Sequence, residues 1–211
     1  MNKSFFLIIM IAILAPFISL SQFYVEPFAG YQKDMNNYKS SFFNSGVQAV
    51  FKMRKYELLL QLQKNFPGSW NAVDSAFTLN TSLPLYAPAQ KNISISFFSV
   101  AFGNRFRIVG KDTGACLVVK LYTGLMFQKI SVKYEYDKND YTVLNPDQSQ
   151  NADGIFVSAG LEYMWQFKKS RFFADLNFST PPWENLRYPS SYNLMAPLSF
   201  NIGYSFMISK K

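Results

Sequence analysis

The chain has 211 residues, of which 49% are hydrophobic and 18% aromatic, and it carries a formal net charge of +8 with no histidine. The absence of histidine excludes a Ser-His-Asp or Cys-His catalytic site, and the single cysteine excludes an internal disulfide and a His/Cys metal site. The mean hydropathy of −0.03 argues against a helical membrane protein.

The N-terminus has the pattern of a secretion signal. Lys3 precedes an apolar run, Phe5–Leu20, and small residues stand at the positions that a signal peptidase inspects. The run has about 16 residues, fewer than the roughly 20 that a transmembrane helix needs, and Pro16 interrupts it. We therefore expect a cleaved signal peptide over residues 1–21 and one domain over residues 22–211; a retained transmembrane helix is the alternative.

After the signal, apolar and polar residues alternate in eight segments, which we take to be strands. The first strand is predicted over Gln22–Gln32, where Pro27 is tolerated only at a strand start or a bulge. The second and third are predicted over Ser45–Met53 and Tyr56–Phe66, joined by a short basic turn. Successive side chains of a strand point to opposite faces, so each strand has one face suited to hydrocarbon.

The fourth and fifth strands are predicted over residues 92–108 and 116–136, with a glycine-containing turn between them. In both, the apolar residues change phase partway along. In the fourth strand they occupy odd positions up to Phe97 and even positions from Phe98 onward. A shared bulge or twist, with the hairpin continuing above the membrane, explains both changes; the alternative is that each strand ends there.

The last three strands are predicted over residues 155–167, 171–179 and 198–208. The connections alternate between short turns and long loops, and the long loops cover residues 33–44, 67–91, 137–152 and 181–197. This alternation and the even strand number are typical of an outer-membrane barrel. We predict an all-β, eight-stranded antiparallel up-and-down transmembrane β-barrel, with a soluble all-β fold as the alternative. Residues 77–85 also alternate, but no pairing partner for them is evident.

The pattern resembles the small outer-membrane β-barrel family that includes OmpX-like and PorT-like proteins. The resemblance covers residues 22–211 and rests on the barrel pattern, on the opening Phe23–Gln32 with its Gly30, and on Asn201–Phe206, which is similar to an assembly signal. Such barrels often end on an aromatic residue, whereas this chain continues through Met207–Lys211. The resemblance implies a location in the bacterial outer membrane. It singles out no activity, because the family is functionally mixed.

Charged residues are expected on the inward phase of the strands. They are Glu26, Lys52, Glu57, Arg105, Arg107, Lys120, Glu162 and Asp175. Four of each sign suggest pairing, since an eight-stranded barrel is just wide enough for side chains to fill it and burial of an unpaired charge costs several kcal/mol. We interpret these residues as a salt-bridged, plugged core; a narrow ion path lined by the same residues is the alternative.

The remaining basic residues gather at the predicted short turns and the C-terminus. The full basic group at this end of the predicted barrel, which includes three of the residues expected to face inward, is Lys52, Arg54, Lys55, Arg105, Arg107, Lys111, Lys168, Lys169, Arg171, Lys210 and Lys211. Most acidic residues outside the strands lie in the long loops. This distribution indicates one basic rim of a barrel and not a nucleic-acid surface.

Aromatic residues in the long loops are the candidates for contact with a partner: Trp70, Tyr86, Trp183, Tyr188 and Tyr192. Prolines restrict the same loops, which suits protein or glycan recognition. The alternative is that these rings belong to the aromatic girdle at the membrane interface or cap the mouth of the barrel.

We therefore predict a monomeric, non-enzymatic outer-membrane protein, without metal or cofactor, in a structural, surface-interaction or secretion-accessory role. The expected partners are outer-membrane lipid and, through the external loops, an envelope or surface protein or a glycan. Two other functions stay open: a narrow small-solute or ion channel, and a lipid-directed enzyme that uses carboxylates and hydroxyls.

Overall fold

The computed structural model describes residues 22–34, 41–53, 56–110, 113–144, 148–167, 170–180, 183–184 and 197–209. The strands of these ranges are β1 (Gln22–Asp34), β2 (Ser41–Lys52), β3 (Glu57–Asn65), β4 (Gly68–Thr78), β5 (Tyr86–Gly110), β6 (Gly114–Glu135), β7 (Tyr141–Thr142), β8 (Gln148–Gln166), β9 (Ser170–Ser179), β10 (Trp183–Glu184) and β11 (Pro197–Ser209). Within the described ranges, no helix is both long and apolar enough to cross a membrane.

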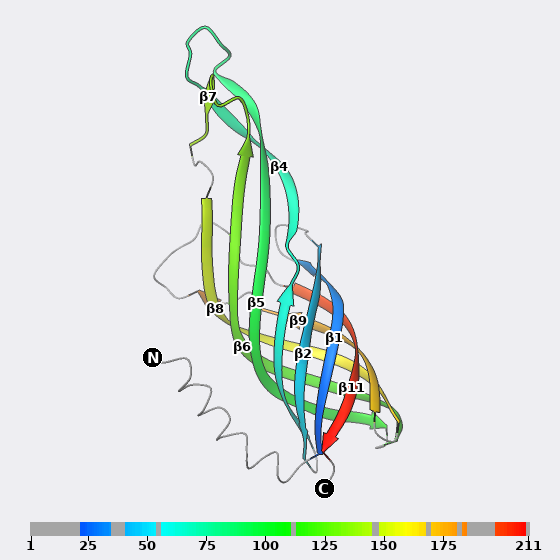
Figure 1. Ribbon diagram of the computed structural model, residues 1–211. Helices are drawn as coiled ribbons and strands as arrows, with labels where there is room; N and C mark the ends of the chain where they lie inside the picture. The colour runs from blue at the N-terminus through cyan, green and yellow to red at the C-terminus, as the bar shows by residue number, and fades with distance from the viewer. Residues whose placement is uncertain are drawn as a thin grey trace.

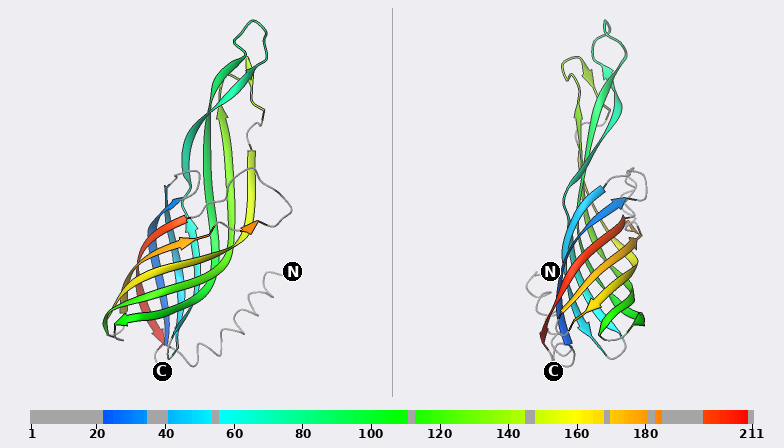
Figure 2. Two further views of the ribbon diagram at one scale, coloured as in Figure 1. Left: turned by 180° about the vertical axis from the view of Figure 1, so that it is seen from behind. Right: turned by 90° about the vertical axis from the view of Figure 1, so that its right-hand side faces the viewer.

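Eight of these strands close into a barrel, whose shape is seen in Figures 1 and 2. Each strand pairs antiparallel with the next in the order β1, β2, β3, β5, β6, β8, β9, β11. The ring is completed by pairing of β11 with β1. Closure lets the backbone N–H and C=O groups of the wall bond to one another, as a hydrocarbon environment requires. The prediction of an all-β, eight-stranded antiparallel up-and-down transmembrane barrel is confirmed.

The two faces of the barrel wall differ in polarity. Along β8 the odd-numbered side chains from Ile155 to Trp165 are exposed, whereas Phe156, Ser158 and Glu162 are buried. The same alternation in the other strands produces an apolar outer surface that includes Leu62, Phe102, Leu121, Leu125, Leu161, Leu176, Phe178, Phe200 and Ile202. Water would make so large an apolar surface costly, so this surface is the lipid-facing band of the barrel.

A tall extension of the sheet rises above one side of the barrel, and we call it the outer lobe (Figure 1). It consists of residues 68–97, 128–144 and 148–153, which include β4, β7 and parts of β5, β6 and β8. In the lobe β4 pairs with the first half of β5, and β7 pairs with the end of β4. Its core has eight buried side chains that pack with Phe42 of β2: Ala76, Ala89, Ile93, Ile95, Ile130, Val132, Tyr134 and Val143.

The outer lobe corrects two predicted boundaries. Residues 67–91 were predicted to be a loop, with residues 77–85 as a further segment that lacked an evident pairing partner. In the structure β4 (Gly68–Thr78) pairs with residues 86–95, because β5 begins at Tyr86 and not at residue 92. Likewise β8 begins at Gln148, inside the predicted loop 137–152.

The same face of β5 points inward in both the barrel and the lobe. Every odd-numbered residue over 93–105 is buried. The outward face changes from polar in the lobe, as at Ser94, to apolar in the barrel, as at Phe98. The hairpin continues beyond the barrel as one paired unit, as predicted. No bulge lies at the change of phase, because the described register between β5 and β6 shifts only between Arg107 and Val109. The apolar residues change face because the surrounding medium changes.

Leu60 tests the assignment of the lipid-facing side. It lies on the outward face of β3, midway between Tyr56 and Lys64, and pairs with Phe102 of β5. We expect Leu60→Arg to lower the free energy of unfolding by roughly 2 to 4 kcal/mol, the cost of a charge facing the middle of the bilayer. Urea titration in phospholipid vesicles measures it.

The matched control is Leu85→Arg, which places the same charge on the exposed surface of the outer lobe. It should leave the unfolding free energy within about 0.5 kcal/mol of the parent protein. Equal effects of the two substitutions would contradict the assignment.

Candidate functional sites: a buried ion-pair cluster and the outer lobe

Seven charged side chains meet inside the barrel, and we call them the ion-pair cluster: Glu26, Glu57, Arg105, Lys120, Glu162, Arg171 and Asp175. They come from six strands, β1, β3, β5, β6, β8 and β9. The alternation of each strand directs them inward, opposite to its apolar residues. All are buried, and Glu57 is the most exposed of them, at 9%.

Arg105 of β5 is at the centre of the cluster. Its Nη2 atom lies 2.6 Å from Glu26 Oε2 and 3.0 Å from Glu162 Oε2, and its Nη1 atom lies 3.6 Å from Glu57 Oε2. It also donates a hydrogen bond of 2.7 Å to Gln48 Oε1 of β2. One guanidinium therefore connects β5 to four other strands, which its planar arrangement of five donors allows.

Lys120 and Arg171 extend the cluster on either side of Arg105. Lys120 Nζ lies 2.5 Å from Asp175 Oδ2 and 3.3 Å from Glu162 Oε2. Arg171 donates from Nη1 to both carboxylate oxygens of Glu57, at 2.8 and 2.9 Å, and its guanidinium carbon lies 3.6 Å from the centre of the Tyr24 ring. Each of the three cations thus contacts at least one carboxylate.

Amide side chains fill the interior between the ion-pair cluster and the outer lobe. Asn44 and Gln63 each donate a hydrogen bond to Gln32 Oε1, at 3.4 and 3.3 Å, and Gln61 donates to Gln63 Oε1 at 2.8 Å. All four side chains are buried. The polar interior is therefore occupied by side chains over both layers, as the width of an eight-stranded barrel predicts.

The structure brings together six of the eight charged residues predicted to face inward: Glu26, Glu57, Arg105, Lys120, Glu162 and Asp175. Lys52 is half-buried at the end of β2, where it pairs in register with Glu57. The expectation for Arg107 is wrong. It shares the inward phase of its neighbour Val118, but it lies at the end of the barrel and is exposed.

Arg171 is the member of the ion-pair cluster that the sequence interpretation missed. Its position beside a predicted short turn assigned it to the basic rim. It is fully buried, because Phe172 faces outward and the preceding residue must therefore face the interior. The alternation of inward and outward residues along β9 was the feature of the sequence that could have placed Arg171 in the interior.

The tip of the outer lobe is a hydrogen-bonded turn that presents apolar side chains. Asn80 Oδ1 accepts hydrogen bonds from the backbone N–H and the hydroxyl of Ser82, and the Leu79 N–H donates to the Asp140 carbonyl oxygen at 2.7 Å. Beside this turn three apolar side chains, Leu79, Leu85 and Tyr86, are exposed by 56% or more. The turn therefore holds an exposed apolar surface beyond the lipid-facing band.

Of the predicted loop-contact residues, Tyr86 lies at this tip, where its ring centre is 5.2 Å from that of Phe77. Trp70 is in β4 and Trp183 is in β10, and the side chains of both lie outside the described part of the structure. Tyr188 and Tyr192 lie outside the described residues.

Asp74 of β4 contacts side chains of two other strands of the outer lobe, β5 and β6. It accepts hydrogen bonds from the Ser75 backbone N–H at 2.9 Å and from the Tyr134 hydroxyl at 3.3 Å, and its carboxylate lies 3.6 Å from Lys91 Nζ. The bond from Ser75, followed by Lys91 and Tyr134, lowers the pKa of the Asp74 carboxyl below its ordinary value.

No model of a known protein family matches the chain, and no curated protein matches its sequence. Solved structures match its fold. Neisserial surface protein A superposes with a TM-score of 0.52 at 12% identity, over 88% of this chain and 97% of that one. A major outer membrane protein from Thermus thermophilus gives 0.50 at 10% identity, over 89% and 98%. The fold is that of the small outer-membrane β-barrels, in agreement with the resemblance drawn from the sequence.

Lys120→Met tests whether the ion-pair cluster holds the barrel together. The substitution leaves Asp175 without a cation and Glu162 with Arg105 alone, and we expect it to lower the free energy of unfolding by about 3 to 5 kcal/mol. Adding Asp175→Asn should recover part of the loss, because it removes the unpaired charge. Urea titration in vesicles measures both. A loss below about 1 kcal/mol for Lys120→Met would show that the cluster does not stabilise the fold.

The lowered pKa of Asp74 predicts a pH dependence confined to the outer lobe. A carboxyl whose folded pKa is below its unfolded value stabilises the fold at pH values above the unfolded value, here about 3.8. That contribution is lost as the pH falls through the folded pKa. Hydrogen exchange of amides 91–95 and 130–134, corrected for intrinsic rates, should show falling protection below this pH. Asp74→Asn should lack this fall; an identical profile in the variant would refute the role of Asp74.

Proposed function

We propose that the protein is a non-enzymatic component of the bacterial outer membrane whose outer lobe contacts a protein or a glycan at the cell surface. The observation that carries the proposal is the tip of the lobe. There, a turn fixed by its own hydrogen bonds exposes Leu79 and Leu85 outside the lipid-facing band. Exposed apolar groups on a rigid support are the usual anchors of a protein contact, because little entropy is lost when they bind.

The orientation follows from the connections of the strands. In outer-membrane barrels the short turns face the periplasm and the long connections face outward. The outer lobe lies on the side of the long connections, so it projects from the cell. The proposal includes export of the chain by residues 1–21, which act as a signal peptide and are then cleaved.

The filled interior favours this role over that of a channel. The ion-pair cluster crosses the barrel, and the amide layer lies above it, so both the charged and the neutral polar side chains are paired with one another. We propose that no continuous water path crosses the barrel at this level. The pairing of Glu26, Glu57, Glu162 and Asp175 with cations also makes them poor candidates for general bases.

Planar bilayers test the channel alternative. The purified protein should give no stable conductance steps. Arg105→Ala removes the central side chain of the ion-pair cluster and is therefore the variant most able to open an ion path through the barrel. Discrete steps from the unaltered protein would overturn the plugged interior.

Photo-crosslinking in intact cells tests the role of the lobe. A benzophenone amino acid at position 86 should form adducts with a surface partner, whereas the same group at position 161, on the lipid-facing wall, should form none with protein. Leu79→Ser combined with Leu85→Ser should reduce the adduct at position 86 by about a hundredfold or more, since burial of each leucine side chain contributes about 1.5 to 3 kcal/mol and every 1.4 kcal/mol is a factor of ten. Adducts unaffected by these substitutions would contradict a contact through the tip.

A further inference from the structure

The outward surface of the outer lobe carries rows of polar side chains, and we call it the polar face. Its residues alternate with the core residues along each strand, so they point away from the buried core of the lobe. The register of the strands places them in three successive rows: Ser96, Lys129 and Asn151; Ser69, Ser94, Ser131 and Ser149; and Asn71, Asn92 and Lys133. In the middle row, β4, β5, β6 and β8 contribute one serine each.

The polar face continues the lipid-facing band of the barrel. The adjoining row of outward residues in the barrel contains Phe98 and Phe127 between Lys64 and Asp153. The row after that is entirely apolar: Leu62, Val100, Leu125 and Ile155. Six residues of strand separate Phe98 from Asn92, so the three polar rows extend over roughly 20 Å beyond the aromatic pair. A lipid headgroup of the outer leaflet is therefore the nearest neighbour of the polar face.

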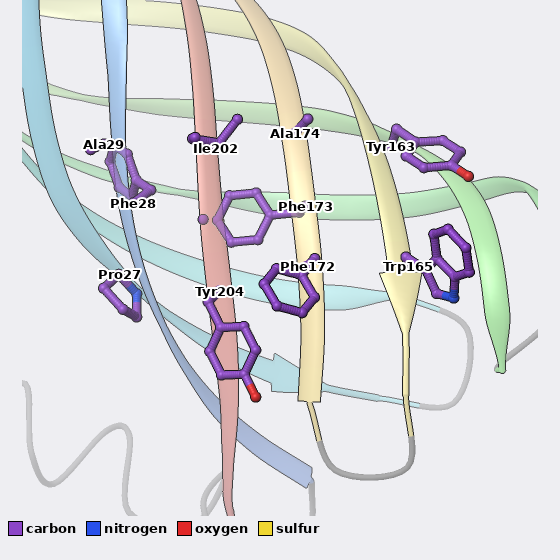
Figure 3. A pocket seen from close by; sticks show the side chains of 11 residues that line it. Pro27, Phe28, Ala29, Tyr163, Trp165, Phe172, Phe173, Ala174, Ile202 and Tyr204 are labelled. Carbon is purple, nitrogen blue, oxygen red and sulfur yellow. The ribbon is translucent and has the colours of Figure 1, made fainter.

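Short polar residues in rows distinguish the lobe from the rest of the outer wall. Nearer the short turns, the outward side chains are apolar or aromatic, as Tyr163, Phe172 and Ile202 show (Figure 3). Contact with water does not by itself favour this composition, because asparagine is depleted in strands and threonine is enriched. Long polar side chains lose the most rotamer freedom when they are covered. A face of serine and asparagine thus loses less entropy when a polar ligand covers it.

A hollow at the border between the polar face and the lipid-facing band suits an anionic group. It has a volume of about 280 Å³ and is lined by Lys64 and Lys129. Ser96 lies between the two lysines: it pairs in register with Lys129, and it is two residues from Phe98, the register partner of Lys64. Asp153 also lines the hollow, on β8 at the end away from Lys64. Lysine ammonium groups are common phosphate ligands, so the part of the hollow near Ser96 fits a phosphate.

We propose that the polar face binds the phosphorylated sugar headgroup of an outer-leaflet glycolipid, with one phosphate between Lys64 and Lys129 and the sugar hydroxyls along the row of four serines. The proposal rests on the membrane orientation of the proposed function. Serine and asparagine side chains both donate and accept hydrogen bonds, as sugar hydroxyls do. A protein partner would require apolar or aromatic anchors. The tip of the lobe has such anchors, and the three rows of the polar face have none.

Native mass spectrometry of the full detergent-extracted protein, loaded with deep-rough lipopolysaccharide, tests the phosphate site. Lys64→Gln and Lys129→Gln should each weaken binding about fivefold, the effect of one lysine on an anionic headgroup at a membrane surface. The matched control is Lys33→Gln, which removes an exposed outward lysine at the same end of the barrel, on β1 and away from the polar face. It should bind as the parent protein does. The same glycolipid after dephosphorylation should bind the parent protein less tightly.

The row of serines is tested by Ser94→Val combined with Ser131→Val. Valine suits a strand and removes the two hydroxyls. The double variant should weaken binding of the glycolipid about tenfold or more, as the loss of two hydrogen bonds predicts. It should leave binding of dioleoylphosphatidylglycerol, which has a phosphate and no sugar, unchanged. Ser149→Val is a second variant of the same row if the double variant does not fold, which the heat-dependent shift in electrophoretic mobility of intact barrels reports.

The outcomes separate this inference from the proposed function. An equal effect of Lys33→Gln would reveal only a general attraction of basic residues to the membrane and would overturn the inference. Equal binding of the dephosphorylated glycolipid, or of dioleoylphosphatidylglycerol, would do the same. If the parent protein fails to insert into lipid, the proposed function fails. If it inserts and forms the adduct at position 86, but the lysine and serine variants bind the glycolipid as the parent does, only the inference about the polar face is refuted.

Discussion

The contact between Arg105 and its carboxylate partners is the interaction on which the barrel depends. Through Glu26 and Glu162 it joins strands that are not neighbours of β5 in the wall, and through Glu57 it joins the adjacent β3. Gln48 of β2 and Asn201 of β11 attach to the same network, the latter through Asp175. All eight barrel strands thereby contribute to one polar assembly. Charges in this interior are tolerable only when paired. The requirement for pairing therefore specifies the relative register of distant strands, which hydrogen bonds between neighbouring strands alone do not.

The outer lobe and the barrel are one continuous sheet in two different media. Along β5 and β6 the inward side chains stay inward, yet in the barrel they include Arg105 and Lys120, and in the lobe they include Ile93 and Val132. In lipid the apolar residues must face out, and in water they must face in. The reversal of polarity at Phe98 and Phe127, whose rings stack 6.4 Å apart, therefore marks the edge of the bilayer within the structure itself.

Alternation in the sequence is sufficient to predict the strand number, the barrel class and most of the inward charges, since the direction of a side chain depends only on its phase. Alternation does not report height along the barrel axis, so Arg107 was expected inside although it lies at the exposed end. Arg171 was misassigned for the opposite reason: its nearness to a turn outweighed its phase. The pairing of β4 was not predictable, because its partner lies beyond a change of polarity that was attributed to a bulge.

A paired interior, an apolar wall and a lobe that reaches past the barrel occur together in one sheet. This combination requires that β5 keeps one face inward from the lobe to the barrel. A nitroxide scan of residues 90–106 in lipid vesicles measures this directly. On the lobe side, before residue 97, nitroxides at even-numbered positions should be accessible to a water-soluble nickel reagent. After residue 97, even-numbered positions should be accessible to oxygen dissolved in the membrane. Odd-numbered positions should be shielded from both reagents throughout. A change of phase at residues 97–98 would contradict the claim.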